Sequence, residues 1–354
     1  MLKFLSKKPR PTLGLDITLS AINMVEISEL KGQLHLESYG QAFFHPNTHD
    51  GSSSTDPDEV AQLIKKIYNT GHFQSKQVVL SVPDSAVLTK IMSIPKSLTD
   101  SEIEELIALE VAKIKPSSLH VYFDYELKGP SKHHTDMVDI LIVLSPSAPI
   151  KQKIESIRRA GLEVQGVDVE SYAVERMGSL ICDGASSGKD AHTIAVLDIG
   201  WDVIRLFVFQ TKGKGSVFTR IEKFGEMQLL QKYAQHHNLT MDDAIQKHLY
   251  DVHDNELKMS SIEYFIPKLM GQITRALKFY DSNCIGEVVQ TVFLAGCMST
   301  LSGLKDLIQS EVDRPTFIIN PLPHFFISNK INKQSLTKVM PTLLIALGLG
   351  LKGL

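Results

Sequence analysis

The sequence predicts an α/β fold made of two similar halves, with a smaller α+β unit inserted into the first half. The main evidence is a duplicated pattern, since Leu15-Asp16-Ile17 returns as Leu197-Asp198-Ile199. Each copy is an apolar strand with an Asp near its end, followed by a tight connection, a second apolar strand, a Gly-bearing turn and a third strand. A repeat of this length indicates two related halves rather than a solenoid.

The first half continues with a polar loop, a helix and two strands. Residues 41–58 are rich in Ser, His, Pro and Asp and predict the loop, and the apolar spacing of 59–69 predicts the helix. Apolar strands are expected at 77–82 and 87–94, and Pro95 ends the second of them.

An α+β unit follows. Thr99 and Glu102 have the spacing of a capping box, which opens an amphipathic helix that reaches Ile114 before Pro116. The remaining elements complete a strand–helix–strand–strand–helix–strand block, with expected ranges of 120–127, 137–144, 149–160 and 163–169.

The second half begins after a flexible-looking linker, Gly184 to Asp190. Beyond its hairpin the chain becomes helical before one more strand and helix. The expected elements are helices at 227–237, 240–249 and 256–280 (kinked by Pro267), a strand at 288–294 and a helix from Leu301. The last apolar segment, 341–351, is expected to form a short helix that packs back on the first half.

Composition is that of an ordinary globular protein, with 354 residues, 43% hydrophobic and 22% charged. A net charge of −3 gives no reason to expect nucleic acid as a partner. Cys182, Cys284 and Cys297 show no paired or metal-type spacing, which favours a reducing cytoplasm. The longest apolar run, 343–351, is about half of the ~20 residues that a membrane crossing needs. The basic segment 1–10 is expected to be a frayed tail or to touch an anionic membrane surface weakly.

The duplicated Asp residues are the candidate functional side chains. An Asp at the end of a buried strand, beside free backbone N–H groups, is suited to holding a hydrated Mg²⁺ against a phosphate. We therefore expect Asp16 and Asp198 to face a nucleotide cleft between the halves. The alternative is that the tripeptide occurs twice by chance, in two unrelated hairpins.

Further motifs occur in order along residues 13–350. They are Ile94-Pro95 with Leu98-Thr99-Asp100-Ser101-Glu102-Ile103-Glu104 and Glu110, Asp124-Tyr125-Glu126, Ala160-Gly161-Leu162, Val167-Asp168-Val169-Glu170, Leu197-Asp198-Ile199-Gly200, Phe224-Gly225 with Gln228-Leu229, and Leu294-Ala295-Gly296 with Ser302-Gly303-Leu304. This ordered set resembles the actin-like ATPase superfamily. It is most similar to the PilM family of type IV pilus assembly, which is related to the cell-division protein FtsA.

The resemblance implies duplicated actin-like (RNase H-like) domains with an FtsA-type inserted subdomain of the SHS2 kind. The implied division is a first domain at 11–86, 165–184 and 338–354, an inserted subdomain at 87–164, a linker at 185–190, a second domain at 191–225 and 281–330, and a helical subdomain at 226–280.

The resemblance also implies residues for ATP and Mg²⁺. Asp16 and Thr18 would lie in the first phosphate loop, with Asp16 and Asp198 holding Mg²⁺ through water. The other implied positions are Asp198 and Gly200 in the second phosphate loop, Gly225 and Gln228 at the helix beside the nucleotide, Gly296 in the adenosine loop and Glu170 near the attacking water.

The family pattern is broken at several positions of this pocket. Asn23 stands where the family has a Lys, which removes a positive charge meant for the phosphates. Glu226 and Cys297 replace the second glycine of two Gly-Gly pairs, where a side chain obstructs the ligand. Thr18 in the first loop, and Trp201 with Asp202 in the second, depart as well. We therefore expect weak ATP binding or none, and slow hydrolysis at most.

These observations favour a cytoplasmic scaffold of type IV pilus assembly. The resemblance implies that it binds the N-terminal cytoplasmic tail of a PilN-like inner-membrane protein, in a groove between the first domain and the inserted subdomain, and links that complex to the assembly motor. The alternatives are an ATP-binding actin-like ATPase or kinase-like phosphotransferase, which needs an intact phosphate cradle, and an FtsA-like protein with a C-terminal membrane helix.

Overall fold

The computed structural model describes residues 11–18, 21–44, 56–114, 120–131, 136–185, 192–210, 216–250, 255–283, 288–352 and 354. The expected tail at 1–10 and nearly all of the expected linker lie outside these residues. The chain forms two compact units. Unit 1 comprises Met1–Ser81 and Ile157–Leu354, and unit 2 comprises Val82–Ser156.

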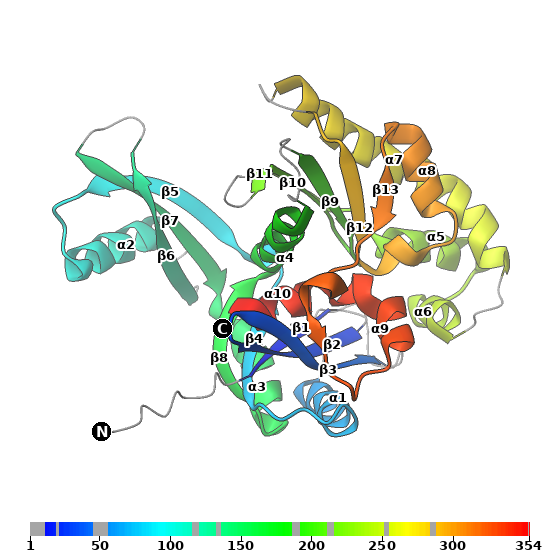
Figure 1. The fold of residues 1–354 in the computed structure, drawn as a ribbon, viewed down its shortest axis with the longest axis horizontal. Helices are drawn as coiled ribbons and strands as arrows, with labels where there is room; N and C mark the ends of the chain where they lie inside the picture. Colours follow the sequence, from blue (N-terminus) through cyan, green and yellow to red (C-terminus); the bar gives the residue numbers. More distant parts are fainter. Residues whose placement is uncertain are drawn as a thin grey trace. The chain divides into compact units, whose positions relative to one another are not determined.

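Unit 1 contains a six-stranded sheet with the order β14-β3-β2-β1-β4-β8, in which β14 from the second half of the chain joins five strands of the first half (Figure 1). Its strands are β1 (Thr12–Ile17), β2 (Ala21–Leu30), β3 (Gln33–Phe43), β4 (Gln77–Val82), β8 (Glu163–Val169) and β14 (Phe326–Ile327). Strand β1 is buried along its whole length, which explains why its sequence is continuously apolar up to Asp16.

The second half forms a five-stranded sheet of matching design, with the order β11-β10-β9-β12-β13. Its strands are β9 (Thr193–Ile199), β10 (Ile204–Gln210), β11 (Ser216–Glu222), β12 (Thr291–Ala295) and β13 (Thr316–Ile318). In both sheets the first three strands are antiparallel, and the strand that carries the Leu-Asp-Ile tripeptide also pairs in parallel with a later strand. The predicted duplication is therefore confirmed.

Two helices lie between the sheets of the two halves, and each packs on the sheet of the half to which it does not belong in sequence. Helix α4 (Glu170–Ala185) follows the last strand of the first sheet but packs on β10 and β11 of the second. Helix α10 (Leu344–Lys352) closes the second half but packs on β1, β2 and α4. The predicted return of 341–351 to the first half is confirmed. Apolar side chains of both sheets, such as Val25 and Val196, meet in this central core.

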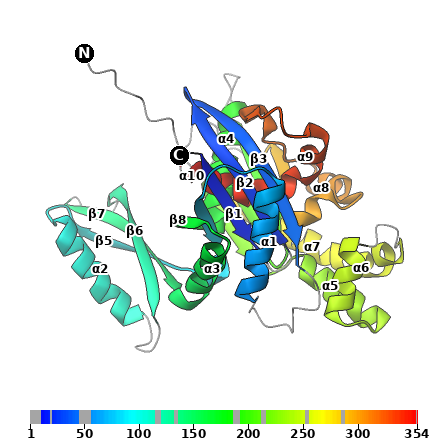
Figure 2. The same cartoon turned by 90° about the horizontal axis from the view of Figure 1, so that it is seen from below.

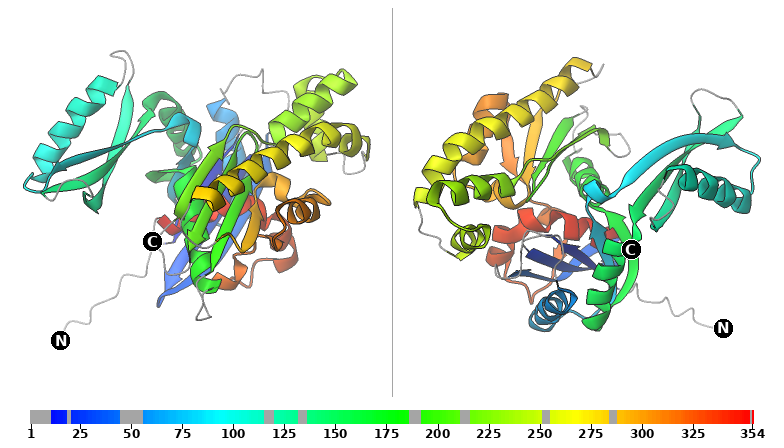
Figure 3. Two further views of the ribbon diagram at one scale, coloured as in Figure 1. Left: turned by 90° about the horizontal axis from the view of Figure 1, so that it is seen from above. Right: turned by 180° about the vertical axis from the view of Figure 1, so that it is seen from behind.

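The outer faces of the two sheets are covered by other helices. Helix α1 (Pro57–Thr70) covers the first sheet (Figure 2). Helices α7 (Asn255–Asn283) and α8 (Leu304–Val312) cover the second, and their apolar residues form a second core with it (Figure 3). Helix α5 (Glu226–His237) packs on α7 and on α6 (Met241–Tyr250).

Unit 2 is an independent α+β unit with its own core. It contains β5 (Leu88–Pro95), α2 (Asp100–Ile114), β6 (Val121–Pro130) and β7 (Met137–Pro146), and its sheet has the order β5-β7-β6. Apolar residues of α2, including Ile107, pack against Ile140 and Ile142 of the central strand. The capping box is confirmed, since the Glu102 N–H donates to Thr99 Oγ1 at 3.4 Å and the Thr99 N–H donates to Glu102 Oε2 at 2.8 Å.

Three predicted elements differ from the structure. Strand β8, which the sequence pattern grouped with the inserted block, pairs in the first sheet beside β4. The boundary between the units instead falls within helix α3 (Ser147–Arg159). Between β12 and α8 the chain first forms a 3₁₀ turn, Cys297–Thr300, so α8 begins at Leu304, three residues after Leu301, near which its start was expected.

One helical stretch, Lys333–Lys352, is long and apolar enough by length and composition to cross a membrane. It joins α9 (Lys333–Val339), a 3₁₀ turn (Met340–Leu343) and α10, and 56% of its apolar window is buried inside the protein. Leu336, Leu343 and Leu347 are fully buried in the central core. The apolar character of this stretch is thus explained by its packing between the sheets.

Candidate functional site

Each half places its Asp opposite a polar residue on the neighbouring strand. Asp16 on β1 pairs across the sheet with Asn23 on β2, and Asp198 on β9 pairs with Arg205 on β10. Directly opposed residues of antiparallel strands have side chains on the same face. The repeated hairpin therefore forms a cross-strand pair at the same place in each half. The two members of each pair are seven residues apart in the sequence, and the residue opposite the Asp is an amide in the first half and a cation in the second.

Asp16 belongs to a buried polar network in the first half. Its carboxylate accepts hydrogen bonds from Ser81 Oγ at 2.8 Å and Asn23 Nδ2 at 3.5 Å. The Asn23 side chain in turn accepts from Gln41 Nε2 at 2.8 Å, and Gln41 also donates to Thr342 Oγ1 at 3.3 Å. The Asp16 carboxylate is 1% exposed, so protein groups rather than solvent satisfy it.

Thr18, the other residue expected in the first loop, closes the β1–β2 connection. Its hydroxyl donates to the carbonyl oxygen of Ala21 and accepts from the N–H of the same residue, both at 2.9 Å. The Thr18 hydroxyl is therefore used in stabilising the turn between β1 and β2.

Arg205 contacts two carboxylates that the sequence analysis assigned to the site, Asp198 and Glu170. Its guanidinium donates to Asp198 Oδ2 at 2.7 Å and also forms an ion pair with Glu170 Oε2. All three residues are buried, with Arg205 only 3% exposed. Asp198 is the next-to-last residue of β9, whereas Glu170 is the first residue of α4. The structure thus brings Asp198 and Glu170 together through a cation that the sequence analysis did not single out.

The start of α5 is bonded to the loop that follows β9. The Glu226 N–H donates to the carbonyl of Gly200 at 3.1 Å, and the Met227 N–H donates to that of Trp201 at 2.8 Å. A Cβ at Gly225 would lie 2.6 Å from the same Gly200 oxygen, so only glycine allows this approach. The first N–H groups of a helix are the usual donors to a phosphate, and here they are used by the chain itself.

Gly296 and Cys297 lie beside the same cluster. Gly296 has φ +84°, and a Cβ there would lie 2.2 Å from the Ile199 carbonyl oxygen and 2.7 Å from Asp198 Oδ1. Burial raises the pKa of the Cys297 thiol well above its usual range, and the negative charge of the neighbouring Glu226 carboxylate raises it further. This thiol remains protonated at neutral pH, which argues against a nucleophilic role.

These residues do not fit a magnesium polyphosphate in the arrangement observed. A metal site needs carboxylate oxygens facing the ion, yet Asp198 and Glu170 face a guanidinium. A phosphate needs free donors, yet the first N–H groups of α5 donate to backbone carbonyls. The buried Glu226 carboxylate adds negative charge beside Asp198. The cation that the carboxylates of Asp198 and Glu170 contact is thus supplied by the chain itself, as the Arg205 guanidinium.

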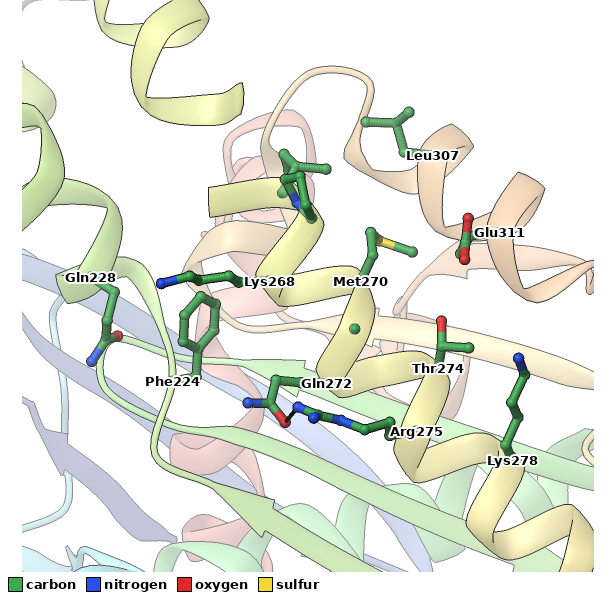
Figure 4. Close-up of a pocket in the computed structure, with 13 residues that line it drawn as sticks. Phe224, Gln228, Lys268, Met270, Gln272, Thr274, Arg275, Lys278, Leu307 and Glu311 are labelled. Carbon is green, nitrogen blue, oxygen red and sulfur yellow. Dashed lines mark hydrogen bonds between the residues drawn. The ribbon is translucent and has the colours of Figure 1, made fainter. Parts of the chain in front are cut away.

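An open hollow of about 1110 Å³ lies along α7 (Figure 4). Gln228 is an expected site residue that lines this hollow. Its Oε1 atom also accepts a hydrogen bond from the Gly225 N–H at 2.6 Å. Lys268, Arg275 and Lys278 line it as well, together with Glu311 of α8. Its lining is therefore cationic on balance, and it suits a small anionic ligand better than a neutral one.

Sequence reasoning missed Arg205 although the necessary signal was present. Asn23 had been compared with the family pattern at the position seven residues beyond Asp16, and Arg205 is the same distance beyond Asp198. In an antiparallel hairpin of equal loop length, the same offset gives the same cross-strand partner. The cation that is absent at residue 23 is therefore present at the matching position of the second half.

Comparison with known proteins places the chain among pilus assembly proteins. The family model of type IV pilus assembly protein PilM matches residues 14–354. A solved structure of a PilM–PilN type IV pilus biogenesis complex is 22% identical, with a TM-score of 0.77, over 97% of this chain and 98% of that one. The ethanolamine utilization protein EutJ from Carboxydothermus hydrogenoformans is 14% identical, with a TM-score of 0.52, over 97% of this chain and 90% of that one. The fold is the actin-like one, with duplicated domains, and this chain belongs to the PilM family of type IV pilus assembly proteins.

Proposed function

We propose that this protein is a scaffold at the cytoplasmic face of the inner membrane that binds the N-terminal cytoplasmic tail of a PilN-like membrane protein. In this proposal it links the membrane complex to the pilus assembly motor, and ATP has little or no part in the link. The observation that carries the proposal is the family match over residues 14–354, joined to a fold shared over nearly its whole length with a PilM solved in complex with PilN.

Unit 2 offers a surface suited to an extended tail. Ile91, Leu141 and Glu126 lie opposite one another on β5, β7 and β6, and Thr89, Val143 and Asp124 form the next row. Residues of one row share a face, and these rows alternate with those that pack on α2. This face, which we call the open face of unit 2, is thus apolar with a margin that carries the acids Asp124 and Glu126, of which Glu126 is paired with Lys128 at 2.8 Å.

The chemistry of the open face matches a membrane-proximal cytoplasmic tail. Such segments are enriched in Lys and Arg, which the acidic margin attracts. Strand β5 is also an edge of the three-stranded sheet as ordered among the described residues, so its outer backbone groups can pair with an added strand.

The proposal is tested with a peptide that copies the first ten or so residues of the cognate PilN-like tail. We expect it to bind the full-length protein and to raise its melting temperature, because a ligand at a hundred times its Kd stabilises the folded state by about 2.7 kcal/mol. A peptide of the same composition in scrambled order is the control. Equal binding of both peptides, or of neither, would remove the proposed function.

The nucleotide part of the proposal has its own prediction. We expect isothermal titration calorimetry with Mg-ATP to show weak binding or none, because Asn23 supplies no cation and Arg205 already neutralises Asp198. Losing one charged hydrogen bond to a polyphosphate costs about 1.5–3 kcal/mol, or roughly ten- to hundredfold in affinity. The cationic hollow along α7 is the feature that favours the opposite result. Low-micromolar binding of Mg-ATP would contradict this part of the proposal.

A further inference from the structure

The Arg205 cluster joins parts of the chain that belong to different halves. Glu170 is carried by α4, which continues directly from β8 of the first sheet, whereas Asp198 and Arg205 are carried by neighbouring strands of the second sheet. The ion pair between Arg205 and Glu170 therefore crosses from the first half to the second, at the point where α4 begins to pack on β10.

The charges of this cluster explain why a cation has to be present. Asp198 is 3% exposed and Glu170 is 8% exposed. Two carboxylates removed from water near each other repel, and each carries a desolvation penalty unless a cation or a proton compensates it. Arg205 is suited to this place because its planar guanidinium stays charged at all physiological pH values and presents separate N–H groups to the two acids.

We propose that Arg205 is a permanent internal cation that takes the place of a bound metal ion in joining α4 to the second sheet. The two halves are then held together in a fixed relation without any ligand, whatever partner the protein binds. The inference does not depend on recognition of a membrane-protein tail, so a failed peptide experiment leaves it intact.

The test measures melting temperature with and without millimolar Mg²⁺ or Mn²⁺, on the full-length protein and four variants. Arg205→Ala removes the cation and should lower the melting temperature by roughly 10 °C. A divalent cation should restore a large part of that loss, because it returns positive charge between the two carboxylates. The unaltered protein should show no shift with either metal ion.

Two further variants separate a charge role from ordinary packing. Leu206→Ala is the matched control, since Leu206 is the next residue of β10 and is 2% exposed. It should also lower the melting temperature, but a metal ion should not restore it. The triple variant Arg205→Met, Glu170→Gln and Asp198→Asn removes the guanidinium together with both carboxylates that it contacts, and it should melt above Arg205→Met alone.

The outcomes decide the proposal in either direction. Rescue of Arg205→Ala by a divalent cation, or a triple variant more stable than Arg205→Met, supports an internal cation. If Arg205→Ala yields no folded protein, the comparison of Arg205→Met with the triple variant still decides. An unchanged melting temperature for Arg205→Ala, or a metal-dependent gain of several degrees in the unaltered protein, overturns the proposal.

Discussion

Replacing Gly14 with alanine should strongly lower the free energy of unfolding. Helix α10 crosses β1 at this residue, and a Cβ there would lie 1.9 Å from the carbonyl oxygen of Ala346 and 2.6 Å from the amide nitrogen of Gly350. Both are backbone atoms, so the helix has to move away from the sheet to admit the methyl group. Overpacking of this kind costs on the order of 3 kcal/mol or more. Urea unfolding followed by circular dichroism measures the loss.

A second glycine supplies the control for this substitution. Gly271 lies within α7, and a Cβ built there meets no atom within 4 Å. Gly271→Ala should therefore stabilise the protein by roughly 0.5–1 kcal/mol, because alanine loses less backbone entropy in a helix. If both alanine variants were equally stable, α10 would not be pressed against β1 as the structure has it.

The packing of α10 on β1 could be predicted in part from the sequence. The apolar run at 341–351 was enough to predict a helix that returns to the first half, because such a run has to be buried. The exchange of α4 and α10 between the halves depends on long-range packing, which no local pattern encodes. The sequence pattern alone grouped β8 with the inserted block, because the sequence of a strand does not specify which strand it pairs with. The division implied by the family resemblance placed residues from 165 onward in the first domain, and β8 does pair in the first sheet.

Some residues of the candidate site could be recognised from the sequence and others could not. Asp16 and Asp198 were recognisable because the hairpin around each is duplicated, and their burial follows from lying at the ends of apolar strands. Glu170 was recognisable only through the family pattern, and the structure adds that its partner is Arg205. A lone Arg within an apolar strand is compatible with either sheet face or a solvent edge, so its role became visible only when the halves were assembled.

Binding of the PilN-like tail should depend strongly on one face of unit 2. Ile91 lies on the open face of unit 2 and is 64% exposed, whereas Leu109 lies on α2 and is 63% exposed. The two residues are aliphatic, equally exposed and on opposite sides of the same unit. Ile91→Asp should weaken binding of the tail peptide by roughly ten- to hundredfold, because a buried apolar anchor contributes about 1.5–3 kcal/mol. Leu109→Asp should leave the affinity within about twofold, as surface changes outside an interface usually do.

The acidic margin gives this experiment a second readout. If the tail is cationic and docks beside Asp124 and Glu126, its affinity for the unaltered protein should fall as salt is added, because exposed charges are screened within about 10 Å at 0.1 M ionic strength. Ile91→Asp adds negative charge to that face, so the variant should lose apolar contact yet show a steeper salt dependence. Titration calorimetry at two salt concentrations separates the effects. Weakened binding by Leu109→Asp, with Ile91→Asp unaffected, would move the tail from the sheet to the surface of α2.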